Sequence, residues 1–411
     1  MVSFSAKADD LHTLLKKTIR SHPDVQVQQV RLDVANTRLS LAIEQFLPTF
    51  SVSFENVAKT RDADINYGTD QAVATFRIQQ PLYTFGRLTA SKQKFAAGVQ
   101  SQSYSIEETR LQLAQAVLQA WGEWYAATLR LEAINTSIHT HQALKDSVSR
   151  RAEQGASSPS EVQLSVARLA SVEAQAINAR LQAKAAKVKL SQLVGERIRD
   201  DVLPKQFLNF GIQDEPKMVQ DALSQHPTLK RYAADIRQSK AELEEEIASL
   251  GPEIYLRAEH QRGDFTTDIP FQNRIFVGFQ SDFGAGASAL IEVKLVEQQI
   301  NTLQAEVEVV KRDITERVSL EQTQLELLDV RQTALEQSLS ATEDIAAAFN
   351  RQYLAGRRSW VEVMNTAREL TQAELELAEL KAAKVLSFWR LSLLVNGLEG
   401  TLALSSPVSM Q

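Results

Sequence analysis

The sequence contains no cysteine, and this absence excludes several kinds of site. Without a thiol, the chain cannot form a disulfide framework, a thiolate metal site or a cysteine nucleophile. An excess of basic residues is absent too, because the formal net charge is −6 at pH 7. The chain therefore has no general positive field to attract nucleic acid, and we expect no nucleic-acid partner.

Long apolar runs and helix-breaking residues are also scarce. The 411 residues include only 15 glycines and 10 prolines, which favours long regular elements. No run of about 18 apolar residues is present, so the sequence predicts no transmembrane helix. The stretch from Met1 to Asp10 has no apolar segment. If the protein is exported, we therefore expect that its signal peptide has been removed.

The positions of the prolines leave room for two very long helices. No proline occurs between Pro81 and Pro159, and none occurs between Pro270 and Pro407. Proline breaks helix interiors, so uninterrupted helices are permitted in both gaps. Both gaps are rich in alanine, leucine, glutamine and charged residues, which are strong helix formers. Their apolar residues recur every three or four positions, as in the seam of a coiled coil.

Two segments, 48–81 and 252–283, interrupt the helical pattern. In the first, Phe50, Val52 and Phe54 alternate with polar residues, and the second shows the same alternation. A period of two with one apolar and one polar face predicts a β-strand. Each segment also has a polar loop at its centre, so each is expected to form two strands.

The two halves of the chain are copies of one pattern. The matching landmarks are His22-Pro23 with His226-Pro227, Pro48 with Pro252, Phe85-Gly86 with Phe283-Gly284, and Gly155 with Gly356. Each copy reads helix, strand, loop, strand, very long helix, tight turn, helix. Such spacing indicates an internal structural repeat.

The predicted fold is mainly α-helical with a small β part, built by internal duplication. The first repeat is expected over 1–203, with strands at about 49–60 and 70–82, a long helix at about 86–154 and a further helix at about 159–195. A linker follows at 204–214. The second repeat is expected over 215–399, with strands at about 252–262 and 271–283, a long helix at about 285–355 and a helix at about 358–396. Residues 400–411 are expected to form a C-terminal tail.

Four strands per chain have a consequence if they lie in a membrane. Strands of about 10 residues cross an outer membrane when they are tilted. In lipid they must close into a barrel, because an unpaired edge has no water to bind. Known barrels begin near eight strands, so closure needs several chains, and three would supply twelve strands. The alternative is a pair of hairpins packed on a soluble helical body.

At this point the pattern resembles the TolC-type outer-membrane efflux and secretion channels. The resemblance covers about Leu11 to Gly397. Its most specific motifs are QPLYTFGRLTASKQ at 80–93, EQGASSPSEVQLSVARL at 153–169 and LAGRRSWVEVMNTAREL at 354–370. It implies a homotrimer in the outer membrane of a Gram-negative bacterium. The trimer would combine a 12-stranded transmembrane β-barrel, surrounded by outer-membrane lipid, with a long antiparallel α-helical barrel that crosses the periplasm.

Channels of this family close at the periplasmic tip, around the helical turns that here contain Gly155 and Gly356. The resemblance implies that Glu362 belongs to an acidic ring at this tip. Asn365 stands where the family often has a second acid, so a single carboxylate ring is expected. The alternative role for Glu362 is to cap the start of a helix.

The same resemblance implies a latch that holds the tip closed. Tyr353 and Arg358 match the partners on one hairpin by their spacing from Gly356. Ser160 and Glu161 match the partners on the other hairpin by their spacing from Gly155. A tyrosine–carboxylate bond and an arginine–hydroxyl bond are expected. The alternative is that Tyr353 and Arg358 serve packing and solubility.

No enzymatic activity is predicted. The sequence has no glycine-rich phosphate loop, no nucleophile elbow and no metal-ligand cluster, so no cofactor and no metal are expected. The resemblance implies a passive duct that works with a periplasmic adaptor protein and an inner-membrane ABC transporter. It points to the type I secretion branch, which exports proteins, including large adhesins.

Two alternatives to this function stay open. The first is an outer-membrane component of a drug or metal efflux system, working with a proton-driven pump. The second is a soluble helical scaffold or a periplasmic adaptor.

Overall fold

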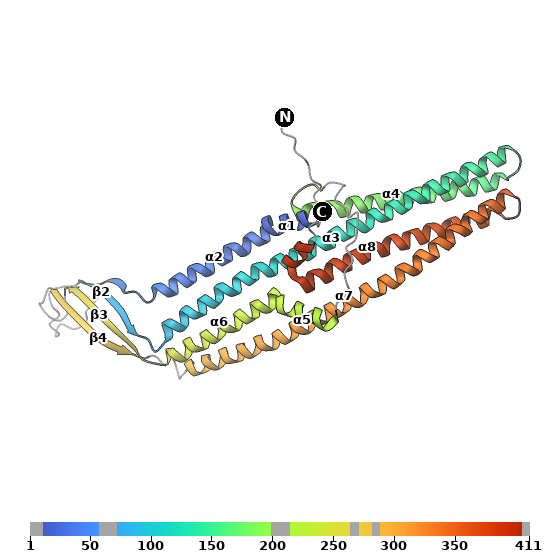
Figure 1. Ribbon diagram of the computed structural model, residues 1–411. Helices are drawn as coiled ribbons and strands as arrows, with labels where there is room; N and C mark the ends of the chain where they lie inside the picture. Colours follow the sequence, from blue (N-terminus) through green and yellow to red (C-terminus); the bar gives the residue numbers. More distant parts are fainter. Residues whose placement is uncertain (1–10, 57–71, 199–213, 264–270, 282–287, 405–411) are drawn as a thin grey trace, which may run out of the picture. The chain divides into compact units, whose positions relative to one another are not determined.

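A computed structural model describes residues 11–56, 72–198, 214–263, 271–281 and 288–404. In these ranges the chain is mainly helical, with one four-stranded antiparallel sheet (Figure 1). This is the predicted fold class. Nearly all of the predicted linker at 204–214, and the last part of the predicted tail at 400–411, lie outside the described residues.

The elements follow the same order in both halves of the chain. The helices are α1 (Leu11–Ser21), α2 (Pro23–Glu44), α3 (Arg87–Glu153), α4 (Pro159–Val194), α5 (Glu215–Gln225), α6 (Pro227–Ser249), α7 (Ser288–Leu354) and α8 (Trp360–Leu404). The strands are β1 (Thr49–Asn56), β2 (Ala72–Tyr83), β3 (Glu253–Arg262) and β4 (Phe271–Gln280). Within the described ranges, no helix has an apolar stretch long enough to cross a membrane.

The helices begin and end where the breakers in the sequence stand. The two longest, α3 and α7, each have 67 residues and contain no proline. Before α3, Phe85 and Gly86 have φ angles of 52° and 95° and turn the chain out of β2. His22 separates α1 from α2, and its Nδ1 accepts a hydrogen bond from the Asp24 amide. At its far end, α8 breaks at Gly397, whose φ is 64°.

The chain divides into two compact units, each assembled from distant segments. Unit one contains residues 1–26, 108–226 and 312–411, and unit two contains residues 27–107 and 227–311. The sheet, α6 and the first parts of α3 and α7 therefore belong to unit two. Unit one contains α4, α5, α8 and the remaining parts of α3 and α7.

In unit one, the apolar core joins four helices. Leu14 of α1, Leu118 and Trp121 of α3, Leu190 of α4 and Val385 of α8 belong to one buried cluster. Trp121 stacks on Tyr125 one turn later, with ring centroids 5.2 Å apart. The cluster ties α3 and α4, which form one helical hairpin, to α8, which forms a second hairpin with α7.

In unit two, the sheet order is β1-β2-β3-β4 and every neighbouring pair is antiparallel. The central pair, β2 with β3, joins the two repeats. The register sets Phe50 opposite Ile78 and Ser51 opposite Arg77. Since directly opposed residues share a face, the period-two pattern gives one apolar face and one polar face across all four strands.

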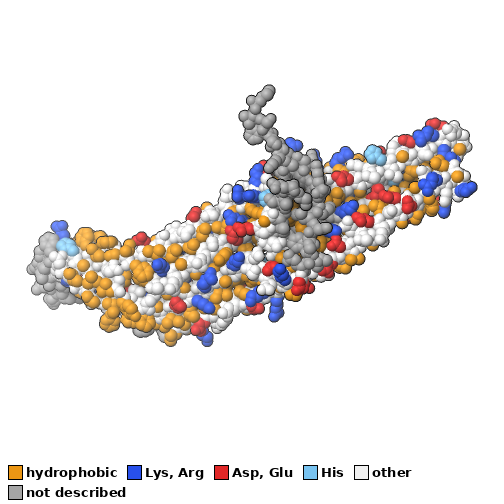
Figure 2. All heavy atoms as spheres, in the orientation of Figure 1, with side chains coloured by type: hydrophobic (Ala, Val, Ile, Leu, Met, Phe, Trp, Pro, Cys, Tyr) orange, Lys and Arg blue, Asp and Glu red, His pale blue; other side chains and the backbone are white. Residues whose placement is uncertain are grey.

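The apolar face of the sheet is largely uncovered within one chain. Its exposed side chains run from Phe50, 75% exposed, on β1 to Phe279, 78% exposed, on β4. The others are Val52, Phe54, Phe76, Ile78, Ile254, Leu256, Ile275 and Val277. Figure 2 shows hydrophobic side chains gathered near the sheet and charged side chains spread over the long helices. An apolar patch of this kind marks a surface that meets lipid or another protein.

Truncating the core of unit one should destabilise the fold. Leu118 is fully buried, so Leu118→Ala is expected to lower the free energy of unfolding by about 2–5 kcal/mol. Gln112→Ala removes an exposed side chain from the same helix and should change it by less than about 0.5 kcal/mol. Denaturant unfolding of the purified variants measures both values. Equal losses would contradict the assigned core.

Candidate functional site

The turn between α3 and α4 is fixed by backbone hydrogen bonds. Gly155 has a φ of 74°, a left-handed conformation that favours glycine. Its amide donates to the Ala152 carbonyl at 2.9 Å, and the Ala156 amide donates to the Arg151 carbonyl at 2.7 Å. This is the Schellman pattern, which satisfies the last carbonyls of a helix.

The turn between α7 and α8 repeats this geometry. Gly356 has a φ of 72°. Its amide donates to the Tyr353 carbonyl at 2.9 Å, and the Arg357 amide donates to the Gln352 carbonyl at 2.8 Å. The two glycines that the sequence singled out therefore occupy equivalent places in the two repeats.

After each turn, the next helix begins with a capping box. The Ser158 hydroxyl accepts from the Glu161 amide at 3.3 Å, and the Glu161 carboxylate accepts from the Ser158 amide at 3.2 Å. Ser359 and Glu362 form the same pair of bonds, at 3.3 Å and 3.0 Å. A capping box satisfies two amides that the first turn of a helix leaves free.

Glu362 is engaged within its own turn. Its carboxylate accepts from the amide and hydroxyl of Ser359 and from the Arg358 guanidinium. The backbone hydrogen bond from Ser359 contributes most to lowering the pKa of Glu362, followed by the Ser359 hydroxyl and Arg358. The residue thus caps α8 and carries a negative charge at neutral pH. Its place in an acidic ring stays a prediction, as does the effect of the half-buried Asn365 at the next predicted tip position.

The structure brings Tyr353 and Glu161 together. Tyr353 is only 6% exposed, and its hydroxyl donates to the Glu161 carboxylate at 3.2 Å. The same hydroxyl lies 2.7 Å from the Ser157 hydroxyl. These contacts join the end of α7 to the start of α4, which belong to different hairpins. They are the tyrosine–carboxylate link that the resemblance implied, and its role as a latch stays a prediction.

The structure does not bring Arg358 and Ser160 together within the described part of one chain. The Arg358 guanidinium donates to Gln352 at 3.0 Å, pairs with Glu362 and lies 4.2 Å from the Phe349 ring centroid. The Ser160 hydroxyl lies 2.8 Å from the Ser158 hydroxyl. Carboxylate and aromatic partners on its own hairpin therefore hold Arg358.

Trp360 is a contact residue that sequence reasoning did not identify. It is 1% exposed, and its indole Nε1 donates to the Ser165 hydroxyl at 2.8 Å. The centroid of its ring lies 4.6 Å from that of the Tyr353 ring. The Arg151 guanidinium of the other hairpin lies 5.1 Å from the Tyr353 ring centroid. The only signal in the sequence is an aromatic residue at the first position of α8. The two hairpins are thus joined by the Trp360–Ser165 bond as well as by the Tyr353–Glu161 bond.

A second carboxylate on α8 has an altered pKa. Burial raises the pKa of Glu374 to about 6, and the negative charge of Glu343 on α7 adds to this effect. A raised pKa means that the folded chain binds this proton more tightly than the unfolded chain does. The contribution of Glu374 to stability is therefore largest at low pH and falls as the pH rises from about 4.5 to about 6.

Replacing Glu374 by a neutral isostere should remove this pH dependence. Glu374→Gln is expected to unfold at a higher temperature than the parent at pH 7.5, with no advantage below pH 4.5. Thermal unfolding across this pH range measures the difference. Glu369→Gln alters an exposed carboxylate of the same helix and is the control. Equal gains at pH 7.5 from both variants would refute the assigned burial effect.

The described residues offer a set of hydrogen-bonded and aromatic contacts between two hairpins. No group of three histidine, aspartate or glutamate side chains in these ranges could hold a metal ion. The arrangement can couple the two hairpins mechanically, since breaking the contacts of Tyr353 and Trp360 would release one turn from the other.

The fold is similar to several solved structures. A membrane protein from Pseudomonas aeruginosa matches with a TM-score of 0.81 and 13% identity, covering 94% of this chain and 90% of that chain. The outer membrane protein VceC from Vibrio cholerae matches with a TM-score of 0.78 and 14% identity, covering 93% and 95%. The CmeC outer membrane channel from Campylobacter jejuni matches with a TM-score of 0.78 and 14% identity, covering 97% and 90%.

A comparison of the sequence with curated proteins gives no significant match. In contrast, both repeats match a protein family, over residues 14–196 and 218–397. Together these ranges include both turns, all four strands and the paired tyrosine and glutamate. The chain belongs to the outer membrane efflux protein family, whose TolC-like channels lie in the outer membrane.

Proposed function

We propose that this chain is one third of a passive outer-membrane exit duct. The observation that carries the proposal is the four-stranded sheet with an exposed apolar face, attached to long helices. An apolar outer face and a polar inner face are what a barrel in lipid requires. The helices would form the periplasmic part of the duct, and the strands would form the part in the membrane.

The edges of the sheet support an assembly of several chains. Among the described strands, β1 and β4 each have a neighbour on one side only. In lipid, their free amides and carbonyls would have no partner unless another strand paired with them. Three chains would join β4 of one to β1 of the next and close twelve strands, as in the homotrimer that the resemblance implies.

The helices support the same assembly. Apolar residues with large exposed areas follow each other at helical spacing on several of them. They include Val27, Val30, Val34 and Leu41 on α2, Ile177, Leu181 and Val188 on α4, and Leu320, Leu327 and Val330 on α7. Seams with this spacing are covered when helices pack side by side. Neighbouring copies would cover them in a trimeric helical barrel.

For the substrate, we propose an unfolded protein, in a type I secretion system. A periplasmic adaptor would dock the duct to an inner-membrane ABC transporter, which supplies the energy. A large adhesin is one such substrate. The support is the overall resemblance of the sequence to this branch of the family; the motifs at 80–93, 153–169 and 354–370 do not separate it from the efflux branch.

The second candidate is a drug or metal efflux duct that works with a proton-driven pump. The description of the matched family as efflux proteins favours it. The solved relatives include the outer membrane channels CmeC and OprN and the transmembrane channel CusC. Both candidates use the same passive channel and differ in the partner at the inner membrane.

The proposed gate is tested by opening it. Tyr353→Phe combined with Arg358→Gln removes the Tyr353 bonds to Glu161 and Ser157, which join the hairpins, and the Arg358–Glu362 pair beside them. Each hydrogen bond of Tyr353 is worth about 1 kcal/mol. Single-channel conductance in planar bilayers is expected to rise in this double variant. The same rise is expected for Glu362→Gln. Tyr232→Phe, on α6, is the control.

Unchanged currents in all of these variants would remove the gate assignment. A parent protein that is soluble without detergent and forms no channel would support a helical scaffold instead.

The two candidate substrates are separated by deleting the gene. We expect one large protein to disappear from the cell surface and the culture supernatant, while tolerance of drugs and dyes is unchanged. Proteomics of both fractions and growth assays measure this, with the intact gene restored as the control. Unchanged exported proteins together with new drug or dye sensitivity would favour efflux.

A further inference from the structure

The polar face of the sheet carries a row of charges across its middle. The register places Ser51, Arg77, Glu259 and Arg274 side by side on the four strands. In the next row toward the helices, Arg257 of β3 lies between Gln79 and Phe276. Three arginines therefore surround one glutamate, an excess of two positive charges per chain.

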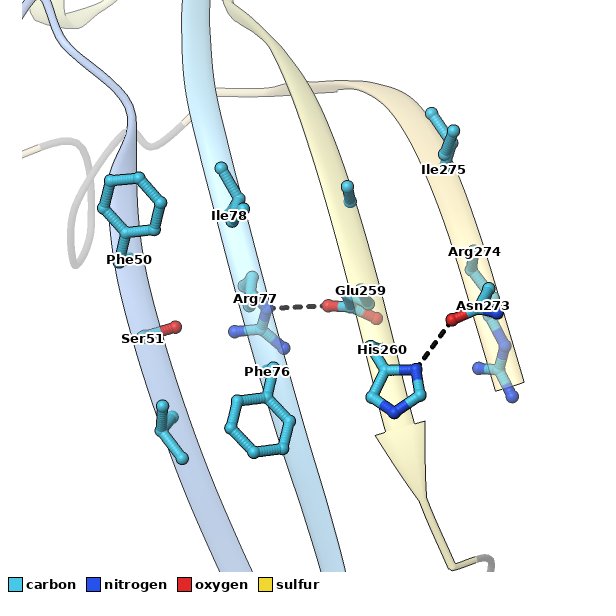
Figure 3. A pocket seen from close by; sticks show the side chains of 12 residues that line it. Phe50, Ser51, Phe76, Arg77, Ile78, Glu259, His260, Asn273, Arg274 and Ile275 are labelled. Carbon is cyan, nitrogen blue, oxygen red and sulfur yellow. Dashed lines mark hydrogen bonds and ion pairs between the residues drawn. The ribbon is translucent and has the colours of Figure 1, made fainter. Parts of the chain in front are cut away.

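The single carboxylate is occupied by two of the arginines. Arg77 Nε donates to Glu259 Oε1 at 2.6 Å, and Arg257 Nε lies 3.1 Å from the same oxygen. The Glu259 side chain is only 11% exposed as a result. Figure 3 shows Arg77 and Glu259 facing each other across β2 and β3. One carboxylate balances one guanidinium, so the charge of the others is not neutralised.

Arg257 retains an unused donor. Its Nε is buried and has no hydrogen-bond acceptor, because the ion pair with Glu259 lacks hydrogen-bond geometry. The guanidinium lies 4.7 Å from the Phe276 ring centroid, which holds it against the sheet. Arg274 on the neighbouring strand is exposed. The exposed guanidinium of Arg274, next to a carboxylate that two other arginines already engage, forms a place that favours an anionic group.

The remaining carboxylates of this face lie at its two ends. Glu55 lies near the end of β1, two rows beyond the row that contains Ser51 and Arg77. Glu253 is at the start of β3, where it pairs with Arg87 of α3 at 2.8 Å. Neither is in the rows of Arg77 and Arg257, so the middle of the face keeps its positive excess.

We propose that Arg77, Arg257 and Arg274 form a cationic belt that binds carboxylate groups of the substrate as it passes through the barrel. This rests on the proposed function, since only a closed barrel turns the polar face inward. Three copies would set nine arginines against three glutamates around one lumen. Inside a narrow, partly desolvated lumen, such an excess attracts anions more strongly than it does on an open surface.

The belt gives the duct a preferred substrate chemistry. An unfolded polypeptide rich in aspartate and glutamate would be drawn into the barrel from the helical tunnel, and small carboxylate anions would be favoured in the same way. Weak, repeated contacts at exposed guanidinium groups allow the chain to leave again, as passage requires.

The test measures block of single channels in planar bilayers by poly-L-glutamate added on the side of the strand loops. Block of the parent channel is expected at low polymer concentration. Arg274→Gln should require about a tenfold higher concentration for half block, because each of the three copies loses one charged contact. Citrate in place of the polymer separates small anions from polypeptides: block by both assigns the site to carboxylates in general.

Two further variants control the experiment. Glu259→Gln removes the negative charge of the belt and should strengthen block, which is the opposite direction from Arg274→Gln. Poly-L-lysine on the same side should not block the parent channel. If the parent forms channels that neither variant changes, the belt is refuted and the duct stands. If the parent forms no channel, the proposed function itself fails.

Discussion

The obligation of every backbone amide and carbonyl to find a partner governs this molecule. Within the sheet the obligation is met by antiparallel pairing, but among the described strands β1 and β4 each have a neighbour on one side only. The helical turns show the same demand met locally, through Gly155, Gly356 and the two capping boxes. Water, a neighbouring copy or a turn must satisfy each group, and in lipid only a neighbouring strand is available.

The fold class, the element order and the duplication were predictable because they depend on periodicity. Period two in 48–81 and 252–283 gave strands with one apolar face, and proline-free stretches gave the helices α3 and α7. The end of α8 was harder to predict. The helix breaks at Gly397 and continues to Leu404. The sequence pattern does not distinguish such a break from the true end of a helix.

The site was only partly predictable. Gly155 and Gly356 have the left-handed backbone that a turn after a long helix requires. The Tyr353–Glu161 contact was implied by the resemblance of the two turns to the channel family. The partners of Arg358 could not be predicted from the sequence. Its long side chain can reach Glu362, Gln352 and Phe349, and the contacts that form depend on its rotamer and on local distances. Trp360 was missed for a related reason: its burial depends on Ser165 of the other hairpin.

The turns have a mechanical consequence. In each one, Schellman bonds end the incoming helix and a capping box begins the outgoing helix within a few residues. These bonds restrain most of the backbone between the two arms, so each hairpin has a stiff end. A force applied along one arm is carried round the bend into the other, and the bending that any movement needs is displaced toward the far ends of the arms.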